Sequence, residues 1–400
     1  MELGYVDAER NQRLMRERIQ ARWMDAYAPT RHVDPILILS VIALSIIGVV
    51  MVYSTKAESG PLAGASGADY DLTKQLLQLA VASVAMVAAA VVDYRYLRAY
   101  VALIYTGGLI LLVAVLTPLG SDQHGIRGGP GTQAWIDLGV FDLQPSELAK
   151  VVLVIALAAL LHERREELNA ATILAAVTLF AVPALLILQQ PDLGTFLVFP
   201  WTAFMLLMIG GVRARWLLGL VLAGGLAVFL VFHFDVLDEY QLARITAFLD
   251  PGNSALAQTS LYNSQQSMIA IGSGGFAGKG FLQGTQTNLS YVPENHTDFI
   301  FTVVGEEFGF LGASIVLGLF GLLLWRGLRI AALAKDTFGT LLAVGAVAIF
   351  SIQLFINVGM TIGISPVTGI PLPFISYGGT SLLSAYLLVG LLLNVHMRRF

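Results

Sequence analysis

Uncharged, apolar stretches long enough to cross a bilayer recur along this 400-residue chain. A spanning helix needs about 20 such residues, because each residue advances the helix axis by about 1.5 Å. Only 12% of the residues are charged, against about 25% in soluble domains. The chain is therefore predicted to be an all-α polytopic membrane protein. The predicted spans cover residues 35–53, 75–92, 99–120, 144–161, 170–188, 193–212, 216–234 and 308–325, and two more fall within 337–395.

The last apolar stretch is too long for one span. Residues 337–395 carry no charged side chain, but the sequence PVTGIPLPFISYGG at 366–379 interrupts them with Pro and Gly. We predict two spans joined by a loop that dips toward the membrane, for a total of about ten helices. Lipid cannot hydrogen-bond to irregular backbone, so this loop has to line a cavity or pack against protein.

Lys and Arg orient the predicted spans, because cytoplasmic loops carry an excess of them. With the N-terminus inside, most of the 23 Lys and Arg residues fall on the cytoplasmic side, and both termini are cytoplasmic. Residues 1–34 then form a cytoplasmic tail, either solvated or folded as an amphipathic helix on the membrane surface. Residues 35–397 form the membrane domain. Its longest connection, 235–297 between spans seven and eight, lies outside with the other long loops.

Composition excludes several classes of function. The chain has no Cys, so disulfides, zinc–thiolate sites and cysteine nucleophiles are ruled out. It has no basic patch with interleaved aromatic residues, so nucleic acid is not an expected partner.

Two polar groups near predicted helix starts stand out. Glu147 and Lys150 are three residues apart, so they share one helix face inside a span. Such a pair is costly in a membrane, and it is either functional or an ion pair that locks two helices. Asp192 precedes an apolar run, where it either caps the helix or belongs to a site on the outer face.

Two glycine-rich segments are candidate anion sites. The glycines around Lys279 could form a backbone nest for a phosphate, with the ammonium group as a point charge, or a flexible loop on the membrane. Gly378 and Gly379, close to Ser376, precede the last span, and the N-terminus of that helix could hold an anion.

The segment ENHTDF places Glu294, His296 and Asp298 just before an apolar run. Asn295 could cap the helix, with Asp298 at its third position, in a variant of the capping box. The helix dipole would then favour the ionised carboxylate. An ionised Asp at this place is also what a general base requires.

Several motifs, taken in order, resemble the signatures of the SEDS (shape, elongation, division and sporulation) family. They are GTQAWIDLG (131–139), QPSELAK (144–150), QQPDLGT (189–195), GKGFLQGTQTNLSYVPENHTDFIF (278–301) and NVGM (357–360) with PVTGIPLPFISYGG. The GTQ at 284–286 and GIPLPF at 369–374 resemble the elongation member of the family more than the division member. The family often has Arg before the Trp of its first motif, but this chain has Ala134 before Trp135.

The resemblance implies a peptidoglycan glycosyltransferase in the bacterial cytoplasmic membrane. It would polymerise lipid II at the outer leaflet and release undecaprenyl pyrophosphate. The resemblance makes Asp298 the essential acidic residue. Candidates to bind or support the substrate are Trp135, Glu147, Lys150, Asp192, Lys279, Glu294, His296, Ser376, Gly378 and Gly379.

No organic cofactor is expected, but a divalent cation, Mg²⁺ or Mn²⁺, could bridge a carboxylate and the pyrophosphate. The expected partners are membrane lipids and a class B penicillin-binding protein, a transpeptidase with one membrane helix. Alternative functions are a lipid II transporter, which interrupted helices would suit, a division-specific polymerase, and a scaffold. A scaffold would not need Glu147 and Lys150 inside a span.

Overall fold

A computed structural model describes residues 32–57, 66–120, 134–137, 142–190, 192–234, 258–289 and 291–399, together with residues 242, 244 and 248. Nearly all of the predicted N-terminal tail lies outside the described residues, as does much of the 235–297 connection. The described chain is mostly helical, as predicted, and its only strands are β1 (Ile136–Asp137) and β2 (Asp142–Leu143), which pair in one short hairpin.

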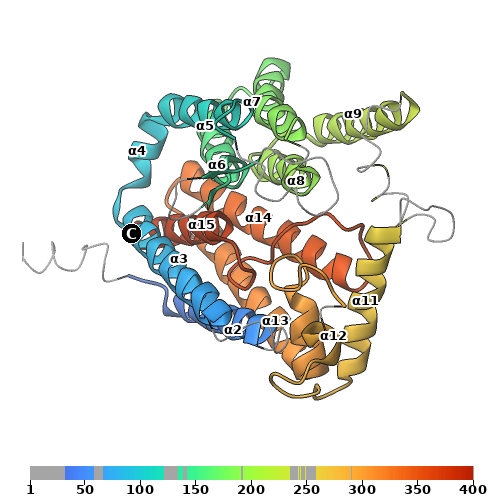
Figure 1. Cartoon of the computed structure of the whole chain (residues 1–400). Helices are drawn as coiled ribbons and strands as arrows, with labels where there is room; N and C mark the ends of the chain where they lie inside the picture. Colours follow the sequence, from blue (N-terminus) through green and yellow to red (C-terminus); the bar gives the residue numbers. More distant parts are fainter. Residues whose placement is uncertain are drawn as a thin grey trace, which may run out of the picture.

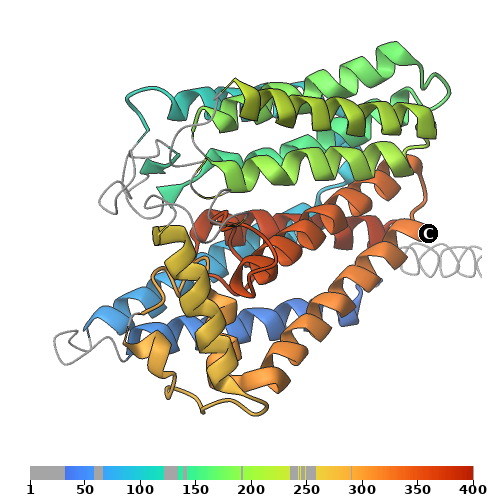
Figure 2. The ribbon, with the colours of Figure 1, turned by 90° about the vertical axis from the view of Figure 1, so that its right-hand side faces the viewer.

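The helices form a bundle whose long members run side by side (Figures 1 and 2). Among the described residues, eight helices are long and apolar enough to cross a membrane, and α5 and α8 are apolar but shorter. The predicted total of ten requires both of these to cross as well. The helices are α2 (Pro35–Ala57), α3 (Ser66–Val91), α4 (Tyr94–Ala99), α5 (Val101–Val115), α6 (Pro145–Glu163), α7 (Ala170–Leu188), α8 (Leu193–Ile209), α9 (Ala214–His233), α11 (Gln258–Gly274), α12 (Thr285–Asn288), α13 (Ile300–Ala332), α14 (Thr337–Thr361) and α15 (Gly379–Met397).

The centre of the bundle is made of α6, α14 and α15, most of whose residues are buried. By contrast, α9 lies at the edge of the bundle and none of its residues is buried (Figure 1). The apolar residues that α9 exposes suit contact with lipid, since hydrocarbon chains are as apolar as the side chains that face them.

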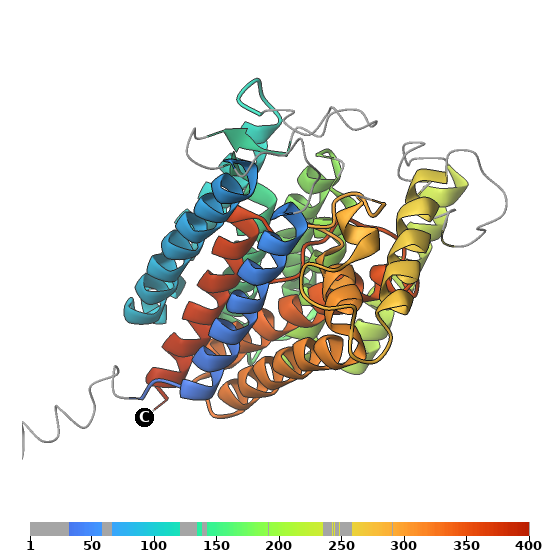
Figure 3. The same cartoon turned by 60° about the horizontal axis from the view of Figure 1, so that its bottom comes forward.

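The start of α2 and the end of α15 lie at the same end of the bundle (Figure 3). Asp34 caps α2 by accepting from the N–H groups of Ile36 and Leu37, and its second oxygen binds Arg326 of α13. We call this the basic end, defined by Arg95, Arg98, Arg164, Arg165, Arg326, Arg329, Lys335 and Arg398. The opposite end, which holds Asp192, Glu294 and Asp298, is called the acidic end.

The connection between α9 and α13 contains more structure than its sequence indicated. The glycine-rich sequence is consistent with a flexible loop. The connection nevertheless contains two helices, the 17-residue α11 and the short α12. The fully buried Ser267 of α11 shares a hydrogen bond with Thr302 of α13 and donates another to the carbonyl of Thr361. Polar side chains therefore fasten α11 to the bundle, which explains why a stretch of low hydrophobicity is helical here.

Helix α13 is longer than the predicted span 308–325 because it begins eight residues earlier and is broken at Gly309 (φ 61°, ψ −156°). The segment 275–280 lies against the break. A Cβ on Gly278 would come 2.0 Å from the carbonyl oxygen of Glu307, so only glycine fits there. Four main-chain bonds join the two segments: Phe310 N–H to Gly275 O (3.0 Å), Leu311 N–H to Phe276 O (3.1 Å), Lys279 N–H to Glu306 O (3.1 Å) and Gly280 N–H to Glu307 O (3.0 Å).

The bundle's orientation is testable because the chain has no native cysteine. Single cysteines replacing the exposed Gln283 and Leu289, on the side of the acidic end, should react with an impermeant thiol reagent added to intact cells. Cysteines replacing the exposed Arg95 and Glu166 at the basic end should react only after the membrane is opened. The reverse labelling pattern would show that the basic end faces outward.

Candidate active site

Asp298 lies in the turn that precedes α13, two residues before the helix begins at Ile300. The predicted capping box is wrong: the N-cap residue is Phe299, and no side chain caps the helix there. Asn295 instead donates from its amide nitrogen to the carbonyl of Thr287, 3.2 Å away. The Asp298 carboxyl group is therefore not used to cap α13.

The segment that joins α14 to α15 makes hydrogen bonds to the backbone carbonyls of residues 296 and 297. The backbone N–H of Tyr377 donates to the carbonyl of His296 (2.9 Å), and the Ser376 hydroxyl donates to the carbonyl of Thr297 (2.6 Å). Ser376 is buried, and its oxygen also accepts from the N–H of Leu372. The predicted dip toward the membrane thus packs on protein, as its backbone requires.

After the carbonyls of His296 and Thr297, the next carbonyl along the chain, that of Asp298, accepts from Asn357 of α14. Its side-chain nitrogen donates to Asp298 O (2.8 Å) and to Ile370 O (2.7 Å), which uses both of its hydrogens. Asn357 is fully buried. Three consecutive main-chain carbonyls are therefore fixed, so the position from which the Asp298 side chain projects is fixed too.

The surroundings of Asp298 favour its protonated form. Burial, followed by the charge of Glu294, raises the pKa of Asp298 to about 7. The charge of Arg244 lowers this pKa, and the charge of Asp192 raises it by a smaller amount. Desolvation penalises the charged form, and neighbouring carboxylates add repulsion. This result corrects the expectation that the helix dipole favours the ionised carboxylate.

Asp192 caps α8, one of the two roles its sequence position allowed. One carboxylate oxygen accepts from the N–H of Thr195 (2.9 Å). The other accepts from the Gln144 amide (3.1 Å) and the Ser146 hydroxyl (3.0 Å), which lie at the start of α6. Asp192 therefore joins the start of α8 to the start of the central helix α6 at the acidic end.

Glu147 and Lys150 form the expected ion pair on α6, with 2.7 Å between Oε1 and Nζ. Each residue is only 1% exposed. The second Glu147 oxygen accepts from Ser384 of α15 (2.8 Å). The pair therefore connects two central helices as well as neutralising both charges.

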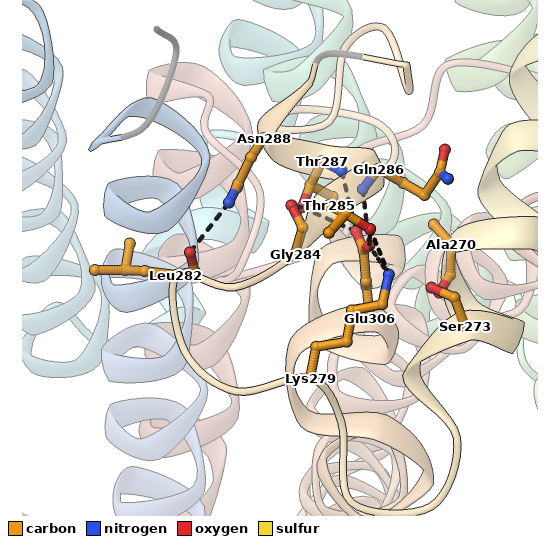
Figure 4. A network of polar contacts seen from close by, with 10 residues as sticks. All are labelled: Ala270, Ser273, Lys279, Leu282, Gly284, Thr285, Gln286, Thr287, Asn288 and Glu306. Atoms are coloured by element: carbon orange, nitrogen blue, oxygen red, sulfur yellow. Dashed lines mark hydrogen bonds and ion pairs between the residues drawn. The ribbon is translucent and has the colours of Figure 1, made fainter. Parts of the chain in front are cut away.

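Lys279 is also paired, in a network shown in Figure 4. Its Nζ lies 2.7 Å from Oε1 of Glu306, which is fully buried in α13. The Glu306 carboxylate further accepts from the backbone N–H groups of Gln286 (2.8 Å) and Thr287 (3.0 Å) at the start of α12. This network anchors the 279–287 loop on α13.

The phosphate nest that the sequence allowed around Lys279 is not formed, because its backbone N–H groups have other partners. The N–H groups of Gly278, Lys279 and Gly280 donate to the main-chain carbonyls of Gly274, Glu306 and Glu307. The first of these bonds closes the end of α11 and the other two complete the broken helix α13, so the three N–H groups are not free to bind an anion.

The remaining predicted residues lie near the start of α15. Gly378 is the N-cap residue and Gly379 the first helical residue. The hydroxyl of Thr380 bonds both the carbonyl of Asp142 and the N–H of Gln144, which docks the helix on the β2–α6 connection. Trp135 directly precedes β1 of the same hairpin and is half-buried. The anion role of this helix start stays a prediction.

The structure thus gathers Asp192, Glu294, His296, Asp298 and Ser376 around one region, while Lys150 and Lys279 are held in ion pairs. The sequence analysis missed Asn357 and Arg244. Asn357 carried a usable signal, since a buried amide in an apolar helix is usually there for a purpose. Arg244, in the long connection, carried none.

These features define a multi-pass membrane protein whose helices enclose an acidic site at one end of the bundle. The chain belongs to the FtsW/RodA/SpoVE family, described as cell cycle proteins, whose model matches residues 35–399. The resemblance inferred from the motifs is thereby confirmed.

Several relatives of known name are similar to the chain over most of its length. Peptidoglycan glycosyltransferase MrdB of Escherichia coli K12 is 36% identical over 92% of this chain and 94% of its own length. The probable peptidoglycan glycosyltransferase FtsW of Geobacter metallireducens is 38% identical over 91% and 95%. A solved chain from a peptidoglycan synthase complex that coordinates polymerization and crosslinking matches with TM-score 0.74 and 31% identity, covering 92% of this chain and 98% of that chain.

Removing one member of the Glu147–Lys150 pair should strand a buried charge and destabilise the protein by about 3–5 kcal/mol. The double variant Glu147→Gln with Lys150→Met should recover much of that stability, measured by thermal unfolding in detergent, but should not recover activity. Normal activity in the double variant would mean that the pair serves only to join α6 and α15.

Proposed function

We propose that this protein is a peptidoglycan glycosyltransferase that polymerises lipid II into glycan strands at the outer face of the bacterial cytoplasmic membrane. Family membership and the names of its relatives support the reaction. The basic end would face the cytoplasm, with both termini, and the acidic end would face outward. Of the described observations, the one that carries the proposal is the placement of Asp298, fixed by three successive carbonyls and with a pKa near neutrality.

Asp298 is proposed as the general base. The 4-hydroxyl of the acceptor sugar gives its proton to the Asp298 carboxylate while its oxygen forms a bond to the anomeric carbon of the donor. The bond from that carbon to the pyrophosphate breaks, and the lipid pyrophosphate leaves with the electron pair. A base works best when its pKa lies near the working pH, and the pKa of Asp298 is about 7.

A divalent cation would have few protein ligands here. Among the described residues, no group of three or more His, Asp or Glu side chains is placed to hold a metal ion. If Mg²⁺ or Mn²⁺ takes part, Asp298 is the side chain that would hold it, together with the substrate's own phosphates, because both ions prefer oxygen ligands.

The proposed macromolecular partner is a class B penicillin-binding protein, with membrane lipids around the bundle. A solved chain that resembles this one comes from a peptidoglycan synthase complex that coordinates polymerization and crosslinking. Crosslinking is the chemistry of a transpeptidase, so the resemblance supports a partner of that class.

The polymerase reading is preferred over a transporter. The described carboxylates that influence Asp298 all lie at the acidic end, whereas alternating access would use polar groups reachable from both sides. In the α6 ion pair, the second oxygen of Glu147 already accepts a hydrogen bond from Ser384. We favour elongation over division on the motifs at 284–286 and 369–374 alone, because the two kinds of relative are about equally similar.

Asp298→Asn should abolish polymerisation and leave folding intact. The change keeps the size of the side chain but removes the basic oxygen, and loss of a general base usually costs about 10²–10⁴-fold in rate. Purified wild type and variant should be compared for glycan strands made from lipid II, with lipid II binding as the control. A variant within tenfold of the wild-type rate would rule out the base role.

The polymerisation rate should depend on pH in a way set by Asp298. Because burial raises the pKa of Asp298 to about 7, the carboxyl is protonated and inactive as a base below that pH. The single-turnover rate should therefore fall about tenfold per pH unit below pH 7 and level off above it. A rate that stays constant down to about pH 5 would indicate an ordinary aspartate pKa, near 3.9.

A further inference from the structure

A groove at the basic end of the bundle has no part in the site around Asp298. It lies where the end of α6, the end of α8 and the start of α14 meet, three helices that pack against one another. Its volume is about 620 Å³, within the range of about 300–1,000 Å³ that small-molecule sites occupy. Arg165, Gly210, Gly211 and Thr337 are among the residues that line it. The groove therefore has the size of a ligand site and a cation in its wall.

Arg165 is held in this wall by a neutral group. Its Nη1 donates to the hydroxyl of Thr337 at 3.1 Å, and it makes no ion pair within the described ranges of the chain. The neighbouring Glu166 and Glu167 are exposed and do not line the groove. A guanidinium group has several N–H donors, so one bond to a hydroxyl leaves others for an anion. Arg165 is therefore positioned on the protein without being neutralised by it.

His162, which also lines the groove, contributes a second donor. Its Nε2 lies 2.6 Å from Nη1 of Arg98. A guanidinium group can only donate, so Nε2 accepts and the hydrogen of the neutral ring is on Nδ1. That nitrogen is buried and has no hydrogen-bond partner among the described residues. A buried donor of this kind is unfavourable until it finds an acceptor, and phosphate oxygens are strong acceptors.

One carboxylate, that of Asp336, lines the groove as well, but both of its oxygens are used. Oδ1 accepts from the N–H of Gly339 at 2.7 Å and caps α14, and Oδ2 accepts from the Tyr94 hydroxyl at 3.1 Å. Lys335 and Arg165 are the cations among the lining residues. Two cations and one carboxylate leave the lining with one net positive charge, so the groove favours an anion.

The groove opens beside helices that expose apolar side chains. Ile209, the last residue of α8, lines the groove and is 49% exposed. After a short turn α9 begins at Ala214, and none of its residues is buried. The guanidinium group of Arg215 lies 5.6 Å from the centre of the Trp216 ring, and Trp at a helix end is typical of the membrane interface. A lipid whose acyl chains lie along α8 and α9 would have its headgroup at this groove.

We infer that this groove binds the phosphate headgroup of an anionic membrane lipid. Arg165 holds the phosphate oxygens in pairs, because its planar set of donors matches their geometry. Basic pockets between membrane helices on the cytoplasmic side bind such headgroups, and the basic end is the one that Lys and Arg assign to that side. The exposed apolar faces beside the groove favour a lipid over a free phosphate. The site lies at the opposite end of the bundle from Asp298 and does not depend on the reaction proposed there.

The bound headgroup joins the ends of three helices. In the protein alone, the bond from Arg165 to Thr337 connects the chain that follows α6 with the start of α14. A phosphate that accepts from Arg165 and lies against the end of α8 adds a third element to this connection. A ligand that binds only the folded state stabilises it. The anionic lipid should therefore raise the midpoint of thermal unfolding as well as bind.

Two neighbouring arginines provide a matched pair of variants. Arg165→Gln removes the cation that lines the groove. Arg164→Gln removes an equally exposed arginine that does not line it, so the net charge changes by the same amount. Thr337→Val keeps the shape of the side chain but removes the hydroxyl that orients Arg165. Binding of phosphatidylglycerol and phosphatidylcholine to the purified full-length proteins should be measured by native mass spectrometry, with glycerol phosphate as a soluble competitor.

Wild type should bind phosphatidylglycerol more tightly than phosphatidylcholine, which carries no net charge. Arg165→Gln should weaken phosphatidylglycerol binding about ten- to a hundredfold, since hydrogen bonds between charged groups are among the stronger ones. Arg164→Gln should stay within about twofold of wild type, because an exposed charge outside the groove contributes little. Thr337→Val should lie between the two. Glycerol phosphate should not displace the lipid, because it lacks the acyl chains.

Equal losses in Arg164→Gln and Arg165→Gln would overturn the assignment, because they would show attraction to diffuse surface charge only. Equal binding of the two lipids by wild type would overturn it too. Displacement of the lipid by glycerol phosphate would reject a lipid as the occupant in favour of a soluble phosphate. Thermal unfolding without added lipid checks the fold of each variant. If Arg165→Gln unfolds early, Arg165→Lys, which keeps the charge, and Thr337→Val decide the outcome, and wild-type affinity in Thr337→Val would then count against the site.

Discussion

Lipid provides no hydrogen bonds, so each main-chain group at membrane depth has to find a partner within the protein. The acidic end of this bundle depends on that constraint, because it is built from irregular backbone. Helix α13 is broken at Gly309, and the segment 275–280 supplies the missing donors and acceptors. The segment 362–378 is irregular as well, and Asn357 and Ser376 bond it to the turn that carries Asp298. The elements that satisfy the backbone are also the elements that position the carboxyl group.

The distribution of charge follows from the same low dielectric. Glu147 with Lys150, Glu306 with Lys279 and Asp34 with Arg326 are each paired where they are buried. A buried charge without a partner would be strongly destabilising. Asp298 is different, because its neighbours are mainly other carboxylates and its pKa is raised to about 7. Groups whose pKa is displaced by burial and by like charges are candidates for chemistry rather than for stability.

The sequence by itself predicted the class of protein and most of its helices. Hydrophobic length, the distribution of Lys and Arg, and proline and glycine interruptions are local properties, so they can be read along one chain. The motifs also pointed to Asp298, Glu147 with Lys150, and Asp192. The structure shows the ion pair and the helix cap, each of which was one of two roles that the sequence left open. The 17-residue α11 was missed because its hydrogen bonds are made by Ser267 with distant elements rather than signalled by its own hydrophobicity.

Only the tertiary structure decided what each charged group has as its neighbour. The glycines around Lys279 have the composition of a phosphate nest, but the N–H groups of Lys279 and Gly280 complete a broken helix at Glu306 and Glu307, further along the chain. The dipole argument for an ionised Asp298 failed because desolvation depends on what encloses a group, which no local pattern contains. Arg244 and Asn357 reach Asp298 from other parts of the chain, through the segment around Thr368 and Ile370. The sequence therefore named the carboxylate, while long-range packing set its protonation and chose the cation beside it.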